Sequence, residues 1–182
     1  MTPEMETAVK YQSHLPALLA CIASTSGPVL ELGVGYFSTP HLHALCLAMR
    51  RDLVSIEAND EWHLEFVKYR TAYYGTGVVG SIAHTIFHGP SLEVLQKHLS
   101  LIQWGVALID DSPGGENRGN NFRYLIDRSD FVVMHDAQKE DENFKAVEPM
   151  LAGLNWHLCT GVFPHTLIAS KTREIPQVLK GM

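Results

Sequence analysis

The sequence predicts an α/β protein built on a doubly wound, mostly parallel sheet of seven strands that ends in an antiparallel hairpin. Short apolar segments alternate with amphipathic ones along the 182-residue chain, which is the order expected of a parallel sheet covered by helices on both faces. Residues 29–39 read as a strand, a two-glycine turn and a helix start, the arrangement at which such sheets bind ligands. Two consecutive apolar segments, 156–163 and 165–170, meet at Pro164, which indicates an antiparallel edge.

The elements follow in a regular order. Residues 2–26 are expected to form one or two helices divided near Pro16, because Leu15, Leu18 and Ile22 recur at helical spacing. The other strands are expected at 29–33, 52–57, 82–88, 104–110 and 130–134, and the other helices at 39–51, 60–74, 91–101, 121–128 and 142–154. We expect a single domain over residues 1–182, with a helical cap at 1–26, an α/β core at 27–170 and a tail at 171–182.

The amino-acid composition limits the classes of protein to which this chain can belong. Apolar residues make up 46% of the chain and charged residues 19%, which is typical of a globular protein. The formal charge of −6 and the lack of a Lys/Arg cluster exclude nucleic acid and anionic membranes as main partners. No apolar run approaches 18 residues and no leader pattern opens the chain, so we expect a cytoplasmic protein. Cys21, Cys46 and Cys159 are widely spaced and are expected to be reduced core residues.

The glycine turn carries two acids that suggest its ligand. Gly33 and Gly35 let another molecule approach the backbone closely, because neither has a Cβ atom. Glu31 precedes them and could hold a positively charged group of that ligand. Glu57 ends the next strand, 22 residues after Gly35, where an acid is placed to bind both hydroxyls of a ribose. A pyrophosphate would be repelled by Glu31, and Ser38 stands where a dinucleotide fingerprint needs its third glycine.

This pattern of acids and glycines resembles the first two motifs of class I S-adenosylmethionine-dependent methyltransferases. The resemblance implies a Rossmann-like methyltransferase fold, with the glycine loop against the methionine part of the cofactor and Glu57 on its ribose. It extends from about Gly27 to Ser170 as an order of strands and helices. It is specific for the cofactor, S-adenosylmethionine, and not for the substrate.

A second group of polar residues follows the fourth and fifth strands. Asp110 and Asp111 end one strand, and His135 and Asp136 end the next; the carboxyl ends of parallel strands are expected to face one crevice. Alternation puts Asp110 and Asp111 on opposite faces of the sheet. The segment resembles a methyltransferase branch with Asp-x-x-Pro-Gly and a later Arg after strand four, and His-Asp after strand five.

The matching residues have several expected roles. Asp110 ends the strand nearest the methyl donor and is a candidate for cofactor contact and for catalysis. Arg118 and Asp111 are candidate substrate contacts, although Asp111 can also be explained as the cap of the turn before Pro113.

Three interpretations of His135 and Asp136 remain open. His135 could be the general base that takes a proton from the substrate, since its ordinary pKa suits this task. Alternatively, Asp110 and Asp136, with or without His135, could hold a divalent cation such as Mg²⁺, Ca²⁺ or Mn²⁺. The third interpretation is structural: Asp136 caps the segment that follows, and His135 is a hydrogen-bonded residue at a strand end.

The sequence therefore predicts a methyltransferase that acts on a small-molecule acceptor, with oxygen as the expected methylated atom. A non-catalytic protein that binds S-adenosylmethionine or a nucleoside is the main alternative, because the chain lacks large substrate-covering insertions. An NAD-linked oxidoreductase is a further alternative, supported by Glu57 alone. A homodimer is one possible arrangement, in which the second copy of the chain would cover the side of the site that such insertions cover in other methyltransferases.

Overall fold

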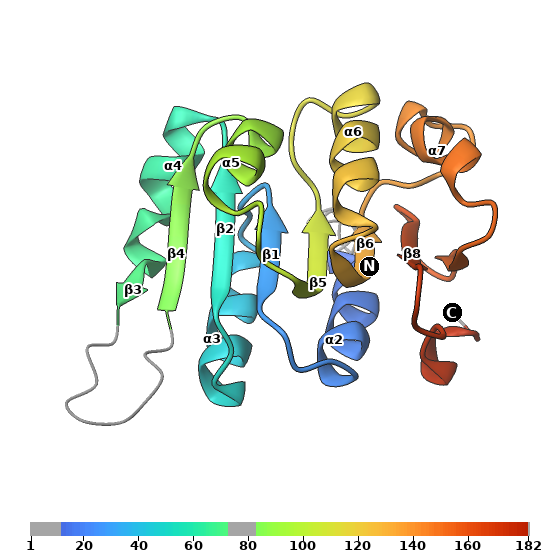
Figure 1. The fold of residues 1–182 in the computed structure, drawn as a ribbon, viewed down its shortest axis with the longest axis horizontal. Coiled ribbons are helices and arrows are strands. Elements are labelled where there is room, and N and C mark those ends of the chain that lie inside the picture. Colours follow the sequence, from blue (N-terminus) through green and yellow to red (C-terminus); the bar gives the residue numbers. More distant parts are fainter. Residues whose placement is uncertain (1–11, 73–82, 182) are drawn as a thin grey trace, which may run out of the picture.

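Alternating side chains give the central sheet two apolar faces, and helices cover both of them (Figure 1). The computed structural model describes residues 12–72 and 83–181. The strands are β1 (Val29–Leu32), β2 (Leu53–Glu57), β3 (Thr71–Ala72), β4 (Ala83–His88), β5 (Trp104–Ile109), β6 (Ser129–Met134), β7 (Asn155–Cys159) and β8 (Thr166–Ser170). The α-helices are α2 (Leu15–Ala23), α3 (Thr39–Met49), α4 (Asp60–Phe66), α5 (Ser91–His98), α6 (Glu116–Leu125) and α7 (Glu142–Val147). Short 3₁₀ helices are η1 (Val67–Tyr69), η2 (Glu148–Met150) and η3 (Gln177–Leu179).

The described strands form one sheet in the order β3-β4-β2-β1-β5-β6-β8-β7. Strands β4, β2, β1, β5 and β6 are parallel, and β8 runs antiparallel to both β6 and β7. The seven predicted strands and the antiparallel pair are thus confirmed, and β3 adds a two-residue strand at the edge. The strand order reverses at β1, with β2 on one side and β5 on the other, which is the position where open α/β sheets bind ligands.

Each face of the sheet has its own hydrophobic core. Leu30 and Leu32 of β1 face α5, α6 and α7, whereas Val29 faces α2 and α3. The same alternation in β5 places Leu108 toward α2 and Ile109 toward α6. Residues just beyond the strands continue this alternation. Each of these side chains therefore points toward the helices on one face of the sheet or toward those on the other.

Several predicted boundaries were wrong for local reasons. Helix α6 begins at Glu116, not at residue 121, because Gly115 turns the chain with φ of 62° and its N–H donates to Asn143 Oδ1 over 2.6 Å. Pro149 lies in η2, after α7 has ended at Val147, so the single helix predicted at 142–154 is divided. The helix predicted at 60–74 ends at Phe66; its last two predicted residues lie outside the described ones.

The predicted N-terminal cap is described only in part. Residues 1–11 lie outside the described ones, and α2 packs against β5 and β6. Pro16 is in the first turn of α2, where a missing N–H is tolerated, so a helix does begin at the predicted division, and the segment expected to hold the first helix lies mostly outside the described residues. Within residues 12–72 and 83–181, each helix is too short or too polar to cross a membrane.

Arg51 fastens α2 to the start of β1. Its guanidinium donates to the carbonyl oxygens of Ile22 (2.7 Å), Thr25 (3.2 Å) and Gly27 (2.6 Å), and to the Thr25 hydroxyl. The side chain is buried, and burial lowers the pKa of Arg51. These bonds satisfy carbonyl groups that the end of α2 leaves without intrahelical partners.

Replacing Arg51 by Ala should lower the free energy of unfolding by about 3 kcal/mol, because it removes the Arg51 donors from the carbonyl groups of Thr25 and Gly27 and leaves a cavity beside them. Urea unfolding followed by circular dichroism measures this change. Arg70→Ala removes an exposed arginine and should change the stability by less than about 0.5 kcal/mol. Equal effects of the two substitutions would contradict the role given to Arg51.

Candidate active site

A pocket of about 680 Å³ opens beyond the carboxyl ends of β1, β5 and β6. This volume is within the range of small-molecule sites in proteins. Its wall joins the glycine loop after β1 to the polar ends of β5 and β6. The lining residues are His14, Gly35, Tyr36, Phe37, Ser38, Trp62, Asp110, Ser112, Arg118, His135, Asp136 and Pro164.

The two glycines of the loop have different tasks. Gly33 has φ of 84°, and a Cβ atom there would lie 2.6 Å from the backbone oxygen of Asp110. The residue therefore allows the ends of β1 and β5 to touch. Gly35 lines the pocket, and its N–H donates to Thr39 Oγ1 over 2.9 Å, which fixes the loop to the start of α3.

Glu31 lies beneath the loop and not in the pocket. Its carboxylate is fully buried and accepts hydrogen bonds from the hydroxyls of Thr39 and Ser55. Burial raises the pKa of Glu31 to about 7, although these hydroxyl groups oppose the shift. The expected direct contact of Glu31 with a cofactor amine is therefore corrected: the residue supports the loop through Thr39, because β1 directs it toward α3.

Glu57 lies at the edge of the same loop. Its carboxylate accepts from the backbone N–H of Val34 over 3.0 Å and from that of Asn59 over 2.7 Å. These bonds join the glycine loop to the N-terminus of α4. The side chain is half-buried, and a carboxylate with two such bonds retains free lone pairs. Glu57 does not belong to the pocket lining given above, so its contact with a ribose remains a prediction.

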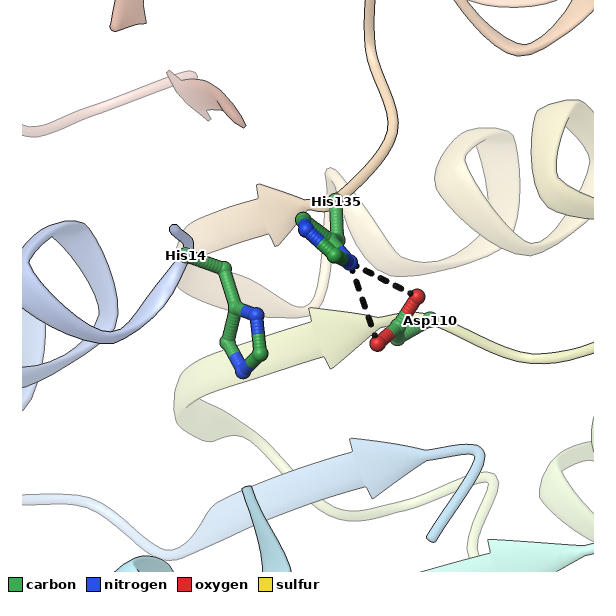
Figure 2. Close-up of side chains that lie close together, drawn as sticks. All are labelled: His14, Asp110 and His135. Carbon is green, nitrogen blue, oxygen red and sulfur yellow. Dashed lines mark hydrogen bonds and ion pairs between the residues drawn. The ribbon is translucent and has the colours of Figure 1, made fainter. Parts of the chain in front are cut away.

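Asp110 and His135 form an ion pair at the centre of the pocket wall (Figure 2). Nδ1 of His135 is 3.2 and 3.3 Å from the two carboxylate oxygens, and Nε2 is 2.9 Å from Ser13 Oγ. Burial alone would raise the pKa of Asp110, but the hydrogen bond and charge of His135, with Arg118, lower it. Burial would lower the pKa of His135, and Asp110 raises it above its ordinary value.

Arg118 ties this pair to the loop that follows β5. Nη2 donates to Asp110 Oδ1 over 3.2 Å, Nη1 to the His135 carbonyl over 2.9 Å, and Nε to the Asp111 carbonyl over 2.8 Å. Arg118 lines the pocket but is almost fully buried, so most of its N–H groups donate to other residues of the protein and not to a ligand. The predicted substrate contact of Arg118 remains a prediction beside this positioning role.

Asp136 faces the pocket next to this pair. Its Oδ2 is 3.6 Å from Arg118 Nη1, and its Oδ1 is 3.8 Å from His135 Nδ1. The backbone of Asp136 is left-handed, with φ of 52°. The three candidate catalytic residues, Asp110, His135 and Asp136, therefore lie together.

Asp111 points to the other face of the sheet, as strand alternation predicted. Its Oδ2 accepts from Ser91 of α5 (2.7 Å) and from Asn117 (3.1 Å) and Asn121 (2.8 Å) of α6. Burial raises the pKa of Asp111. The prediction that Asp111 binds substrate is corrected, because its carboxylate is buried between two helices.

His14 is the site residue that sequence reasoning missed. It precedes α2, whose N-terminus reaches the carboxyl ends of the strands, and its ring centre lies 4.6 Å from that of His135. The ring is 2% exposed, and within residues 12–72 and 83–181 neither nitrogen has a hydrogen-bond partner. Burial lowers the pKa of His14 to about 4. The sequence could have indicated this position only through topology. A helix that runs antiparallel to β1 and leads into its start begins at the level of the carboxyl end of β1, so residues just before α2 lie near the site.

Aromatic rings also line the pocket. Tyr36 packs 5.5 Å from Trp62 and 5.1 Å from Phe66, measured between ring centres. Tyr36 and Trp62 both line the pocket and are 59% and 41% exposed. Partly exposed rings of this kind favour flat or apolar ligands.

The position of Glu31 gives a testable pH dependence. A folded-state pKa of about 7 against an ordinary 4.5 means that folding keeps Glu31 protonated. Its contribution to stability is complete below about pH 4.5 and is lost as the pH rises through 7, a change of about 3 kcal/mol.

Glu31→Gln should therefore unfold at nearly the wild-type urea concentration at pH 5 and at a higher one at pH 8. Groups that titrate in both proteins cancel when the two curves are subtracted. Glu174→Gln, a change at an exposed acid of the tail, should follow the wild type throughout. A constant difference between wild type and Glu31→Gln from pH 5 to 8 would contradict this assignment.

Comparison with known proteins supports the architecture. A scan of family models and a search of curated proteins find no match to this chain. Among solved structures, the O-methyltransferase from Bacillus cereus with SAH matches at a TM-score of 0.58 and 14% identity, covering 94% of this chain and 82% of that one. TomG of Streptomyces achromogenes, an O-methyltransferase of tomaymycin synthesis solved with SAM, matches at 0.58 and 17%, with 87% and 78% covered.

A third solved structure gives the same result. The SAH-bound methyltransferase PaMTH1 of Podospora anserina matches at a TM-score of 0.57 and 12% identity, over 85% of this chain and 75% of that one. At such identities the likeness establishes the fold. The chain has the Rossmann-like fold of class I S-adenosylmethionine-dependent methyltransferases, as the glycine loop and its acids predicted.

Proposed function

We propose that this protein binds S-adenosylmethionine and transfers its methyl group to an oxygen atom of a small-molecule acceptor. The observation that carries the proposal is the continuity of one pocket from Gly35 of the loop to Asp110 and His135 at the ends of β5 and β6. The fold places this pocket where the strand order reverses. The solved relatives named above, bound to SAM or SAH, agree with this cofactor.

The cofactor would lie along the carboxyl ends of β1 and β2. The backbone at Gly33 and Gly35 would face its methionine part, and Glu57 would accept hydrogen bonds from the two ribose hydroxyls. Asp110 and Asp136 supply negative charge on the pocket wall, which suits a ligand with a sulfonium and an amine. Glu31 supports this arrangement indirectly, since it holds Thr39, which in turn holds the Gly35 N–H.

The chemistry requires alignment and the removal of one proton. The methyl–sulfur bond breaks as the methyl–oxygen bond forms, the sulfur retains the electron pair as S-adenosylhomocysteine is released, and the acceptor oxygen loses its proton. Because the sulfonium is already activated, the protein mainly holds donor and acceptor in line. Asp110 lies at the pocket surface with His135 behind it, and this pair is where the proton would be received.

The rings of Tyr36 and Trp62 favour an acceptor with a flat or apolar body. They line the same pocket as Asp110, and both retain exposed area. An acceptor that stacks on these rings could direct a hydroxyl group toward the acids. We therefore propose a small aromatic or otherwise planar alcohol or phenol as the substrate class.

The cofactor assignment predicts a specific loss of affinity. Glu57→Ala should weaken S-adenosylhomocysteine binding about 10- to 100-fold in calorimetry, because two charge-assisted hydrogen bonds to the ribose are lost. Glu174→Ala is the matched control and should bind as the wild type does. Unchanged affinity in Glu57→Ala would show that the ribose lies elsewhere, and a melting temperature raised by NAD alone would favour the oxidoreductase alternative.

Transfer itself is tested with methyl-labelled S-adenosylmethionine and a pool of small phenols and alcohols. Asp110→Asn should reduce transfer about 10²- to 10⁴-fold, the usual effect of removing an acid–base group, while it lowers S-adenosylhomocysteine affinity much less. Asp127→Asn, an exposed change, should retain full transfer. Tight cofactor binding without transfer to any acceptor would favour the non-catalytic alternative.

A further inference from the structure

We infer that His14, Asp110 and His135 form a binding site for a divalent transition-metal ion. Each residue offers one ligand atom, and these atoms lie within 4.8 Å of one another (Figure 2). An ion with ligand bonds of about 2.1 Å joins atoms up to about 4.2 Å apart, so the cluster needs only to contract slightly. The candidate site draws on three separate parts of the chain: the start of α2 and the ends of β5 and β6.

The unpaired ring of His14 is the strongest independent sign of a missing partner. Both nitrogens are buried and have no hydrogen bond to any other residue that the structure describes, whereas buried polar groups are nearly always paired. The ring lines the pocket beside Asp110 and His135. A bound ion would give one of these nitrogens the partner that the described part of the chain does not provide.

The hydrogen bonds of the other two residues leave suitable lone pairs. Ser13 Oγ is 2.9 Å from His135 Nε2 and can accept a hydrogen bond from the Nε2 proton, so an ion would replace the Nδ1 proton that now pairs with Asp110. Arg118 binds Oδ1 of Asp110 over 3.2 Å, whereas Oδ2 faces His135 Nδ1 at 3.3 Å, so an ion between these two atoms would take Oδ2 as its ligand. Outer hydrogen bonds of this kind orient the ligands of metal sites.

The types of ligand indicate the class of ion. Two imidazoles and one carboxylate suit Zn²⁺, Fe²⁺, Co²⁺ or Ni²⁺ better than Mg²⁺ or Ca²⁺, which prefer oxygen ligands. This set differs from the oxygen-rich pair Asp110 and Asp136 expected from the sequence, because His14 replaces Asp136 in it. Asp136 lies within 3.8 Å of His135 and adds a second negative charge nearby.

An ion held by three protein ligands leaves open positions toward the pocket. A hydroxyl group bound there would lose its proton more readily, as water does on catalytic zinc. This consequence rests on the proposed methyl transfer, but the binding of the ion does not.

The test uses untagged protein, stripped with chelator and titrated with Co²⁺ and Zn²⁺ in the absence of S-adenosylmethionine. We expect one Co²⁺ per chain with visible absorption bands, displacement of Co²⁺ by Zn²⁺, and binding of Mg²⁺ at least 100-fold weaker. A hundredfold excess of Zn²⁺ over its dissociation constant should raise the melting temperature by about 5–10 °C.

Two variants at one position separate metal binding from folding. His14→Ala and His14→Phe should each weaken Co²⁺ binding at least 100-fold, and His14→Phe should melt no lower than the metal-free wild type, because it removes unpaired polar atoms while filling the space. His157→Ala is the matched control, since His157 also has an unpaired buried nitrogen but lies in β7; it should bind Co²⁺ normally.

Three outcomes would overturn the inference: no stoichiometric ion, equal binding by wild type and both His14 variants, or equal affinity for Mg²⁺ and Zn²⁺. None of these measurements uses the cofactor, so their failure leaves methyl transfer untouched. Conversely, a protein that binds Co²⁺ through His14 but never transfers a methyl group would support this site and contradict the proposed function.

Discussion

The contact between Gly33 and the backbone at Asp110 is the constraint on which the site depends. Any side chain at Gly33 would collide with the Asp110 carbonyl and with the Cα atom of Asp111. Because a glycine stands there, β1 and β5 can end side by side, in register from Val29 with Val106 to Leu32 with Ile109. The glycine loop and the polar end of β5 thereby become two walls of one pocket, and every proposed role of the site follows from that proximity.

Charge balance explains why the pocket wall is arranged as it is. Asp110 is largely buried beside His135, and an unpaired buried carboxylate would be strongly destabilising. Arg118 and His135 compensate it, and Arg118 is in turn fixed by two carbonyl groups. The same residues that make the wall stable also keep a carboxylate ionised at the pocket surface, which is the state needed for binding a cation or receiving a proton.

The residues before α2 bear on the chemical roles that the sequence left open. Ser13 and His14 cover the ring of His135, so this histidine has little direct access to a ligand in the pocket. A covered imidazole is poorly placed to take a proton from an acceptor by itself. It is well placed to act through Asp110, or through an ion shared with Asp110 and His14, and both routes agree with the proposed transfer to oxygen.

The sequence by itself determined the element order, the seven strands, the glycine turn and the opposite orientations of Asp110 and Asp111. These features depend on hydrophobic periodicity and on residue types that act over a few neighbours. Tertiary structure decided which acids reach the pocket: Glu31 faces α3 and is buried with Thr39 and Ser55, and Asp111 is enclosed by α5 and α6. It also brought His14 beside residues more than 90 positions away, a contact that no local pattern encodes, because it arises from α2 and the ends of two strands packing on one face of the sheet.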